Sequence, residues 1–414
     1  MSRPLKAWAI TALLAFPLYA AGADTPNSDS SMFVFSGFGT VGEVHSSEHS
    51  ADFVDSVLQP NGAGYSRNWS PTVDSLIGGQ ISVHVTPELS AVVQAIAQQN
   101  YDGTYTPHVE WANISYQITQ DLSVRIGRFE LPNFLYSDTR NVRFTLPWVR
   151  PPVEVYGLIP ATASDGVGGS YRLALWNLTN TTQGSLVQAN VRQPHDLGTL
   201  RARDSYNIAN TTEYNSLTFR ASYQHVRLTL SSLDGFFDSF RMFGPQGIAI
   251  ADKYNADNKP ATTVVLGVSY DPGRLFLNGE WEHVRFDSFF GESTAWYTSG
   301  GYRFGNITPY AIYARSRAQS NSDPGLTLAN LPPATAGIAA GLNSGLSALL
   351  RTISTQRTLS IGVRWNVASN VDLKVQLDHT RINADSDGNL INLQPGFLPG
   401  RTVNLFNATL DFVL

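Results

Sequence analysis

The chain has 414 residues, a formal net charge of −5 and no cysteine. Without cysteine it has no disulfides and no thiol chemistry, and the net negative charge argues against a nucleic-acid partner. Beyond residue 23 no run reaches the roughly eighteen uninterrupted apolar residues that a membrane-spanning helix requires. Any insertion into a membrane must therefore use β-strands.

The first residues have the pattern of a secretory signal peptide. Arg3 and Lys6 precede an apolar stretch at 7–19, and the small residues Ala21-Gly-Ala23 follow it. This order of basic, apolar and small residues predicts cleavage before Asp24. The alternative, a single anchoring helix, is disfavoured because the apolar stretch is short and contains Pro17. We therefore expect residues 1–23 to be a signal peptide and residues 24–414 to be the exported protein.

From Met32 onward the sequence alternates between polar or small residues and aliphatic or aromatic ones, with a period of two, which is typical of β-strands. A polar stretch at 193–212 interrupts the alternation as a loop, and Gln224-His225 is interpreted as a turn. The pattern predicts sixteen strands, at 32–44, 76–85, 89–101, 108–118, 122–128, 166–176, 185–192, 215–223, 226–233, 261–270, 275–285, 294–304, 307–317, 359–367, 371–382 and 401–414.

Short polar turns alternate along the chain with longer, variable connections. In a bacterial transmembrane barrel the turns on the periplasmic side are short, the external loops are long and the strand count is even. We therefore predict an all-β fold, a single transmembrane antiparallel β-barrel with both ends of the chain on the periplasmic side. A soluble β-sandwich also alternates, but it does not repeat a strongly polar second face with aromatic residues at the strand ends.

The connection at 130–165 is the third long loop and the least regular one. A loop of this length inside a compact domain is usually functional, and the prolines of Leu146-Pro-Trp-Val-Arg-Pro-Pro152 stiffen it. We predict that it folds back into the barrel lumen as a constriction loop. A second long segment, 326–350, is interpreted as an external loop with a short helix, and a second plug is its alternative.

Charged residues on the small and polar face are the candidates for a pore constriction. Opposed carboxylates and guanidinium groups across a narrow opening orient dipolar or charged solutes. The bland alternative is that the arginines only neutralise lumen carboxylates such as Glu280, Glu282, Asp372 and Asp411. The predicted constriction set comprises Asp138, Glu154 and Asp165 from the loop and Arg125, Arg172, Arg192, Arg220, Arg227 and Arg364 from the wall.

Three motifs resemble the Gram-negative trimeric outer-membrane porin superfamily, in a mostly uncharacterised branch. They are Met32-Phe-Val-Phe-Ser-Gly-Phe-Gly39, Val124-Arg-Ile-Gly-Arg-Phe129 and Pro147-Trp-Val-Arg-Pro-Pro-Val-Glu-Val-Tyr156. The resemblance implies a homotrimer of sixteen-stranded barrels with loop three inside, Glu154 and Asp165 as loop acids, and Arg125 as a wall base. The chain departs from this family at its last residue, Leu414, where an aromatic residue is usual.

These observations predict a water-filled channel in the cell outer membrane for the passive diffusion of small hydrophilic solutes and ions, with outer-membrane lipid around it. The alternative is a substrate-selective, anion-preferring channel for small organic acids. An enzyme is disfavoured because the sequence has no Gly-x-Ser-x-Gly or His-Glu-x-x-His motif. We therefore predict no catalytic residue, no cofactor and no metal site. A soluble secreted adhesin is the remaining alternative.

Overall fold

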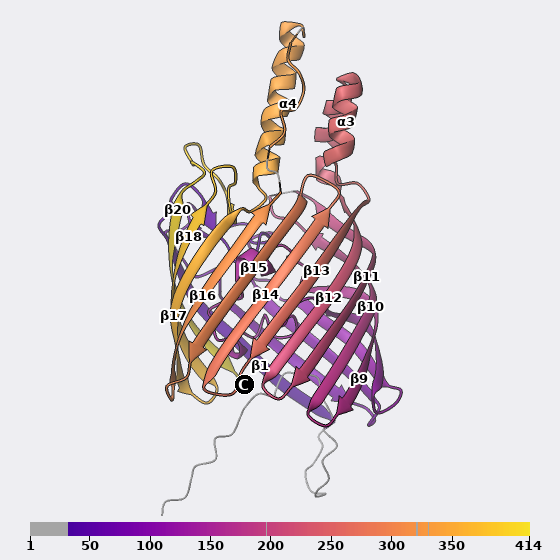
Figure 1. Ribbon diagram of the computed structural model, residues 1–414, viewed down its shortest axis with the longest axis vertical. Helices are drawn as coiled ribbons and strands as arrows, with labels where there is room; N and C mark the ends of the chain where they lie inside the picture. Colours follow the sequence, from indigo (N-terminus) through magenta and orange to yellow (C-terminus); the bar gives the residue numbers. More distant parts are fainter. Residues whose placement is uncertain (1–31, 196, 320–321, 330) are drawn as a thin grey trace, which may run out of the picture.

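The computed structural model describes residues 32–195, 197–319, 322–329 and 331–414, so the predicted signal peptide lies outside the described residues. Within these ranges, seventeen strands form one antiparallel sheet, and the pairing of β1 with both β5 and β20 closes it. β4 is a two-residue addition to β1, and the other sixteen strands form the barrel of Figure 1. The predicted fold class is therefore confirmed.

The barrel strands differ in length between neighbouring parts of the wall, and β10 and β11 are the longest. Their bounds are β1 (Phe33–Ser46), β5 (Leu76–His84), β6 (Leu89–Gln98), β7 (His108–Gln117), β8 (Leu122–Glu130), β9 (Ala163–Leu175), β10 (Leu178–Arg192), β11 (Thr199–Tyr214), β12 (Leu217–Leu230), β13 (Lys259–Tyr270), β14 (Leu275–Phe286), β15 (Gly291–Tyr302), β16 (Ile307–Ala318), β17 (Gln356–Ala368), β18 (Val371–Ile382) and β20 (Thr402–Val413).

The strand count was predicted correctly, although two of the predicted strands are wrong. The predicted loop 193–212 covers most of β11, and the two predicted strands 215–223 and 226–233 correspond to the single strand β12. β11 escaped detection because polar residues occupy both of its faces and its pairing shifts between Arg203 and Tyr206. The supposed turn is continuous strand, in which Gln224 points inward and the outward His225 stacks on Tyr206 with the ring centroids 5.2 Å apart.

The alternation of side chains gives the barrel an apolar outer face and a mostly polar inner face. On β17, Leu359, Ile361 and Val363 are 42–54% exposed, whereas the intervening Ser360 is 5% exposed. On β18 the predicted inward set, Asp372, Lys374, Gln376 and Asp378, is buried. The outward apolar residues form the surface that a barrel presents to lipid.

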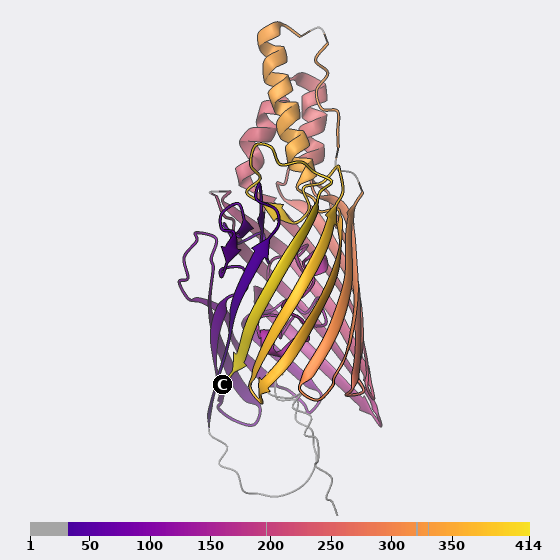
Figure 2. The same cartoon turned by 90° about the vertical axis from the view of Figure 1, so that its left-hand side faces the viewer.

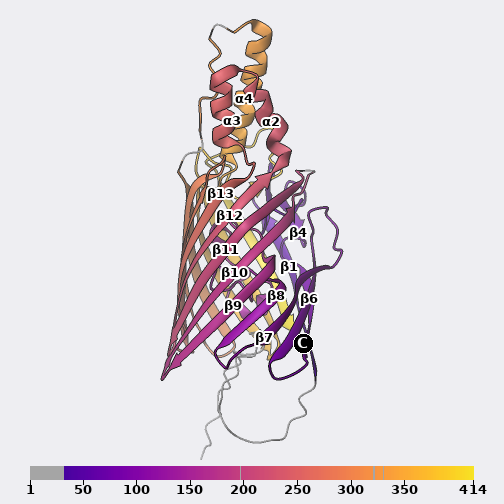
Figure 3. The same cartoon turned by 90° about the vertical axis from the view of Figure 1, so that its right-hand side faces the viewer.

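Three helices stand on one end of the barrel. α2 (Asp234–Arg241) and α3 (Gly244–Tyr254) lie between β12 and β13, and α4 (Pro333–Arg351) lies between β16 and β17. They pack on one another through Phe237, Phe240 and Leu346 and project away from the barrel, as Figures 2 and 3 show. The segment 326–350 is therefore external, with a 19-residue helix in place of the short one expected, and the alternative of a second plug is wrong.

The C-terminus and the short turns lie at the opposite end of the barrel (Figure 1). None of the helices in the described residues is both long and apolar enough to cross a membrane. The remaining short elements are β2 (Asp52–Phe53), β3 (Ala63–Gly64), β4 (Trp69–Ser70), β19 (Leu390–Ile391), α1 (Val153–Tyr156) and the 3-10 turns η1 (Arg143–Thr145) and η2 (Ser231–Leu233). β2, β3 and β19 form a small separate sheet, which joins the first and last external loops.

Candidate functional site

The connection between β8 and β9, residues 131–162, is called loop 3 here, and it lies inside the barrel. At its start Asn133 is 1% exposed and contacts two neighbouring wall strands. Its side-chain amide donates to Gln224 at 2.8 Å, its side-chain oxygen accepts from Asn207 at 2.5 Å, and its backbone oxygen accepts from Ser222 at 2.8 Å. These bonds tie the first turn of loop 3 to β11 and β12.

Loop 3 then builds an apolar core within the lumen. Trp148 is fully buried, and its ring packs edge-on against Tyr297 of β15 at 5.6 Å. Phe134 stacks on Tyr156, from the two ends of the loop, at 4.4 Å. Wall residues of β13–β16 complete the core: Val265, Phe276, Ala295, Tyr310, Ile312 and Ala314. Burial of this much apolar surface stabilises the inserted position of the loop.

Glu280 of β14 is the polar centre of this core. Its two carboxylate oxygens accept from the backbone N–H of Leu135 at 2.7 Å, the Tyr156 hydroxyl at 2.6 Å and the Tyr297 hydroxyl at 2.9 Å. A buried carboxylate costs much free energy unless it is hydrogen-bonded. The hydrogen bonds to Glu280 therefore come from loop 3 and from one tyrosine of the wall. They do not come from an arginine, as the alternative in which wall arginines neutralise the lumen carboxylates would require.

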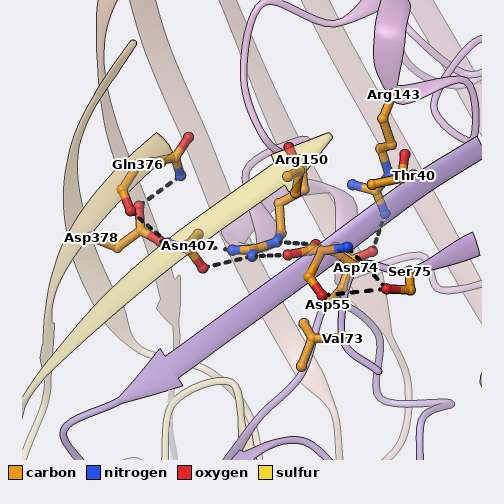
Figure 4. A network of polar contacts seen from close by, with 12 residues as sticks. Thr40, Asp55, Val73, Asp74, Ser75, Arg143, Arg150, Gln376, Asp378 and Asn407 are labelled. Carbon is orange, nitrogen blue, oxygen red and sulfur yellow. Dashed lines mark hydrogen bonds and ion pairs between the residues drawn. The ribbon is translucent and has the colours of Figure 1, made fainter. Parts of the chain in front are cut away.

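Arg150 ties loop 3 to the first external loop and to two wall strands (Figure 4). Its Nε and Nη2 donate to the two oxygens of Asp74 at 2.8 and 2.5 Å, and Nη2 also donates to Asn407 at 2.7 Å. Asp378 lies 3.7 Å from Nη1. A second ion pair joins Arg143 to Asp55 at 2.5 Å. Bidentate arginine–carboxylate pairs are both strong and directional.

Two wall cations hold backbone oxygens of loop 3. Lys374 of β18 is fully buried, donates to the carbonyl oxygen of Arg143 at 2.7 Å and pairs with Asp411 at 2.9 Å. Arg364 of β17 donates to the carbonyl oxygen of Leu146 at 3.1 Å and pairs with Asp372 at 2.8 Å. Arg364 therefore points inward as predicted, and both it and Lys374 position the loop.

Glu154 lies in α1, within loop 3, and is 2% exposed. Its carboxylate accepts from the Gln356 amide at 2.7 Å and from the Thr358 hydroxyl, both on β17. Burial raises the pKa of Glu154. Its prediction as an acid that lines the opening is wrong, because the side chain points into the wall.

Besides Arg364, four of the predicted residues are inward and retain contact with water. Arg125 of β8 pairs with Glu130 at 2.7 Å and lies over the Phe129 ring. Arg220 of β12 donates to the Pro132 carbonyl oxygen at 2.6 Å. Arg172 shares the inward face of β9 with the buried Ser164 and Gly168. Asp138 of loop 3 is exposed.

Asp138 has an unusual electrostatic environment. Although its surface is accessible to water, it lies deep in the barrel, where burial and the nearby Glu130 raise the pKa of its carboxyl. Arg220 acts in the opposite direction. Asp138 is therefore close to a wall acid, Glu130, and to a wall base, Arg220.

No family model and no curated protein matches this sequence. Solved structures match the fold over nearly the whole chain. OmpF of Salmonella typhi, solved as a complex with daunomycin, has a TM-score of 0.55 and 12% identity, covering 92% of this chain and 97% of its own. The outer-membrane channel DcaP of Acinetobacter baumannii has a TM-score of 0.53 and 10% identity, covering 94% and 99%.

A third match is OmpT, an outer-membrane protein of Vibrio cholerae, with a TM-score of 0.51 and 10% identity over 94% of this chain and all of that one. The barrel, the inserted loop and these matches agree. The chain has the porin fold. At these identities the likeness concerns the fold alone, so the roles of individual residues follow only from their positions in this structure.

Three members of the predicted constriction set lie on the outside of this porin-fold barrel. Asp165 belongs to the outward face of β9 and pairs with Arg128 at 2.8 Å. Arg192 is exposed and donates to the Tyr101 hydroxyl at 2.5 Å. Arg227 is on the outward face of β12 and donates to Asn258 at 3.0 Å. Their prediction as constriction residues is wrong.

The wrong assignment of these residues to the lumen has a physical cause near the helix-bearing end of the barrel. There the inward residues of β10, β12 and β14 are apolar, including Val187, Val226 and Val284, and they face Ile159 of loop 3 around a cavity of about 120 Å³. The polar face of these strands therefore points outward near the helix-bearing end. The alternation along the strands was predicted correctly, but the assignment of the polar face to the lumen is wrong near the helix-bearing end.

Sequence reasoning also missed residues that position loop 3. Asp55 and Asp74 lie in the first external loop, and Asp74 is 76 residues from the arginine that it binds. Glu130 is the last residue of β8. Trp148 stood out in the sequence only as part of a proline-rich block. No local pattern connects these residues, because their contacts exist only after the barrel has closed.

Proposed function

We propose that this protein is an outer-membrane porin, a water-filled channel for the passive diffusion of small hydrophilic solutes and ions. The observation that carries the proposal is the position of loop 3 within the lumen, where wall residues from β11 round to β20 hold it. A loop fixed in this way narrows the barrel without unfolding it. The apolar outer face fits a location in the cell outer membrane, reached through a cleaved signal peptide.

The water-accessible charges beside loop 3 favour the second candidate, an anion-preferring channel for small organic acids. Arg172 and Arg220 point into the lumen, and among the described residues neither has a carboxylate within ion-pair distance. Asp138 is the exposed acid of the loop, and burial and the nearby Glu130 hold the pKa of its carboxyl above that of an ordinary aspartate. An arginine-rich passage of this kind attracts anions.

Two further parts of the proposal concern assembly and chemistry. We propose a homotrimer that is surrounded by lipid, with no nucleic-acid partner. The carboxylates inside the barrel have structural roles in the proposal: Glu280 and Glu154 bind loop 3 to the wall. We therefore propose a channel without catalytic activity.

Planar-bilayer recording tests the proposal. Purified protein added to a bilayer is expected to give stepwise conductance. The recording uses KCl at about 1 M, which screens interactions between distant charges. Under a KCl gradient the sign of the reversal potential distinguishes general diffusion from anion preference. Arg172→Gln with Arg220→Gln is expected to move the reversal potential toward cations. A folded protein that leaves the bilayer silent would contradict the channel, and an unchanged reversal potential would contradict the anion-preferring candidate.

A further inference from the structure

Three arginines lie directly opposite one another on the outside of the barrel. Arg315 of β16 pairs in register with Arg357 of β17, and Arg357 pairs with Arg381 of β18. All three are exposed, and the residues on either side of them are buried inside the barrel. The three adjacent strands face the viewer or lie at the left in Figure 1. The three residues are called the arginine row here.

The arginine row is unfavourable as an isolated arrangement. Directly opposite residues on neighbouring strands have Cβ atoms about 4.5–5.5 Å apart, and like charges in such pairs are destabilising. Among the described residues, no hydrogen bond or ion pair reaches these three side chains. By contrast, Arg285 on the nearby β14 has two acidic neighbours, Asp287 at 3.1 Å and Glu292 at 3.8 Å. The arginine row is therefore a concentrated positive charge that the protein itself leaves uncompensated.

Its position corresponds to a membrane interface. Arg357 is the second residue of β17, and Arg315 is three residues before the end of β16, both at the end of the barrel from which α4 projects. Toward the middle of the barrel the outward face becomes apolar. Leu359 follows Arg357 on β17, Leu377 follows Arg381 on β18 after the exposed His379, and each leucine is 49% exposed. A cross-strand row thus separates lipid-facing surface from the external loops.

The same row continues into two tryptophans. Arg315 lies opposite Trp296 of β15, and Trp296 lies opposite Trp281 of β14. Tyr313, on the apolar side of Arg315, packs against Trp296 with the ring centroids 5.5 Å apart. Tryptophan and tyrosine concentrate where hydrocarbon meets the headgroup region, because the ring is apolar and its edge is polar.

We propose that the arginine row binds the phosphate groups of an anionic lipid in the outer leaflet, whose acyl chains lie along Tyr313, Leu359 and Leu377. Each guanidinium group offers a planar pair of donors that matches two phosphate oxygens. Bound phosphate removes the repulsion between Arg315, Arg357 and Arg381, and the adjoining apolar surface accounts for the lipid part of the ligand. A free phosphate ion would use only half of this surface.

The proposal is tested with the full-length protein in neutral detergent. The probe is bisphosphorylated lipid A, the control lipid is phosphatidylcholine, and binding is counted by native mass spectrometry. The test variant is Arg315→Gln/Arg357→Gln/Arg381→Gln. The matched control, Arg67→Gln/Arg241→Gln/Arg274→Gln, removes the same charge from arginines in a loop, a helix and a turn, of which Arg67 and Arg274 are exposed and Arg241 is half-buried.

The test variant is expected to bind lipid A about 100-fold more weakly, which is about five-fold for each arginine near a charged lipid surface. The control and phosphatidylcholine binding are expected to remain unchanged. A triple Arg→Lys variant retains the charge but loses the paired donors, so it is expected to bind with intermediate affinity. Retention of heat-modifiable gel mobility by each variant establishes that the barrel is folded.

Three results would overturn the proposal. In the first, the test variant binds lipid A as tightly as the wild-type protein, or the control loses as much affinity. In the second, inorganic phosphate binds to the arginine row as tightly as the lipid, which would make the row a site for free anions. In the third, the test variant changes the oligomeric state and leaves lipid binding intact, which would make the row an interface between copies of this chain.

Discussion

Replacement of Arg150 by methionine tests the anchoring of loop 3 most sharply. The Arg150 and Asp74 side chains are only 4% and 0% exposed, and the guanidinium group also donates to Asn407 and lies near Asp378. Removal of one partner from a buried ion pair leaves an uncompensated charge and costs about 3–5 kcal/mol. We expect Arg150→Met to lower the free energy of unfolding by about this amount, because Asp74 stays buried without its cation.

The ion pair of Arg303 with Asp271 provides the matched control. Its two hydrogen bonds, both 2.7 Å, repeat the bidentate geometry of the Arg150 pair, but the side chains are 36% and 43% exposed. Exposed pairs contribute about 0–1 kcal/mol, so Arg303→Met is expected to change stability little.

Urea titration of the detergent-solubilised protein, followed by tryptophan fluorescence and gel mobility, measures both variants. The double variant Arg150→Met/Asp74→Leu is expected to recover part of the loss, since apolar replacement of a buried pair is often neutral. A loss below about 1 kcal/mol for Arg150→Met, or a double variant that costs the sum of the two single changes, would refute the reasoning.

The remaining predictions concern selectivity and packing. Burial and Glu130 raise the pKa of Asp138, so on acidification Asp138 is expected to become protonated at a higher pH than an ordinary aspartate and the anion share of the current is expected to rise. Reversal potentials recorded across pH should show this change as a step, and Asp138→Asn is expected to remove the step. A step that persists in the variant would assign the titration to another group. Trp148→Ala is expected to cost about 3–5 kcal/mol, as for other buried aromatic residues, and to raise conductance noise; wild-type stability and noise would exclude Trp148 as an anchor. Arg220→Gln alone is expected to shift the reversal potential toward cations by less than the double change with Arg172, and an equal shift would exclude a contribution of Arg172.

The barrel itself was predictable because its physical signal is repeated in nearly every strand. The faces of β17 and β18 were assigned correctly from alternation alone, since one face meets lipid and the other meets buried polar groups. The count of sixteen was correct because the missed β11 and the divided β12 compensated for each other. β11 has polar residues on both faces, so a signal based on hydrophobic contrast is absent there.

The insertion of loop 3 was also predictable, from its length and its prolines, whereas its individual contacts were not. Arg125 and Arg364 were correctly predicted to point inward, because they lie farther from the helix-bearing end than the region where the inner wall becomes apolar. Arg192 and Arg227 lie in that region, and there the polar face is the outer one. Asp165 was assigned to the loop, but β9 begins at Ala163 and fixes Asp165 outward.

The anchors of loop 3 depend on pairings that no local pattern encodes. Arg150 meets Asp74 and Asn407 because closure of the barrel brings the first loop and the last strand together. Glu154 meets Gln356 across 202 residues for the same reason. The charges of the loop were therefore recognised as important, while the division between residues that anchor it and residues that face the solute required the structure.

Single-channel recording of a loop 3 deletion tests the central claim most directly. Residues 141–153 are replaced by Gly-Ser-Gly. If loop 3 narrows the lumen, the deletion variant gives larger conductance steps than the wild-type protein in the same bilayer and salt. Equal steps from two correctly folded proteins would contradict the account.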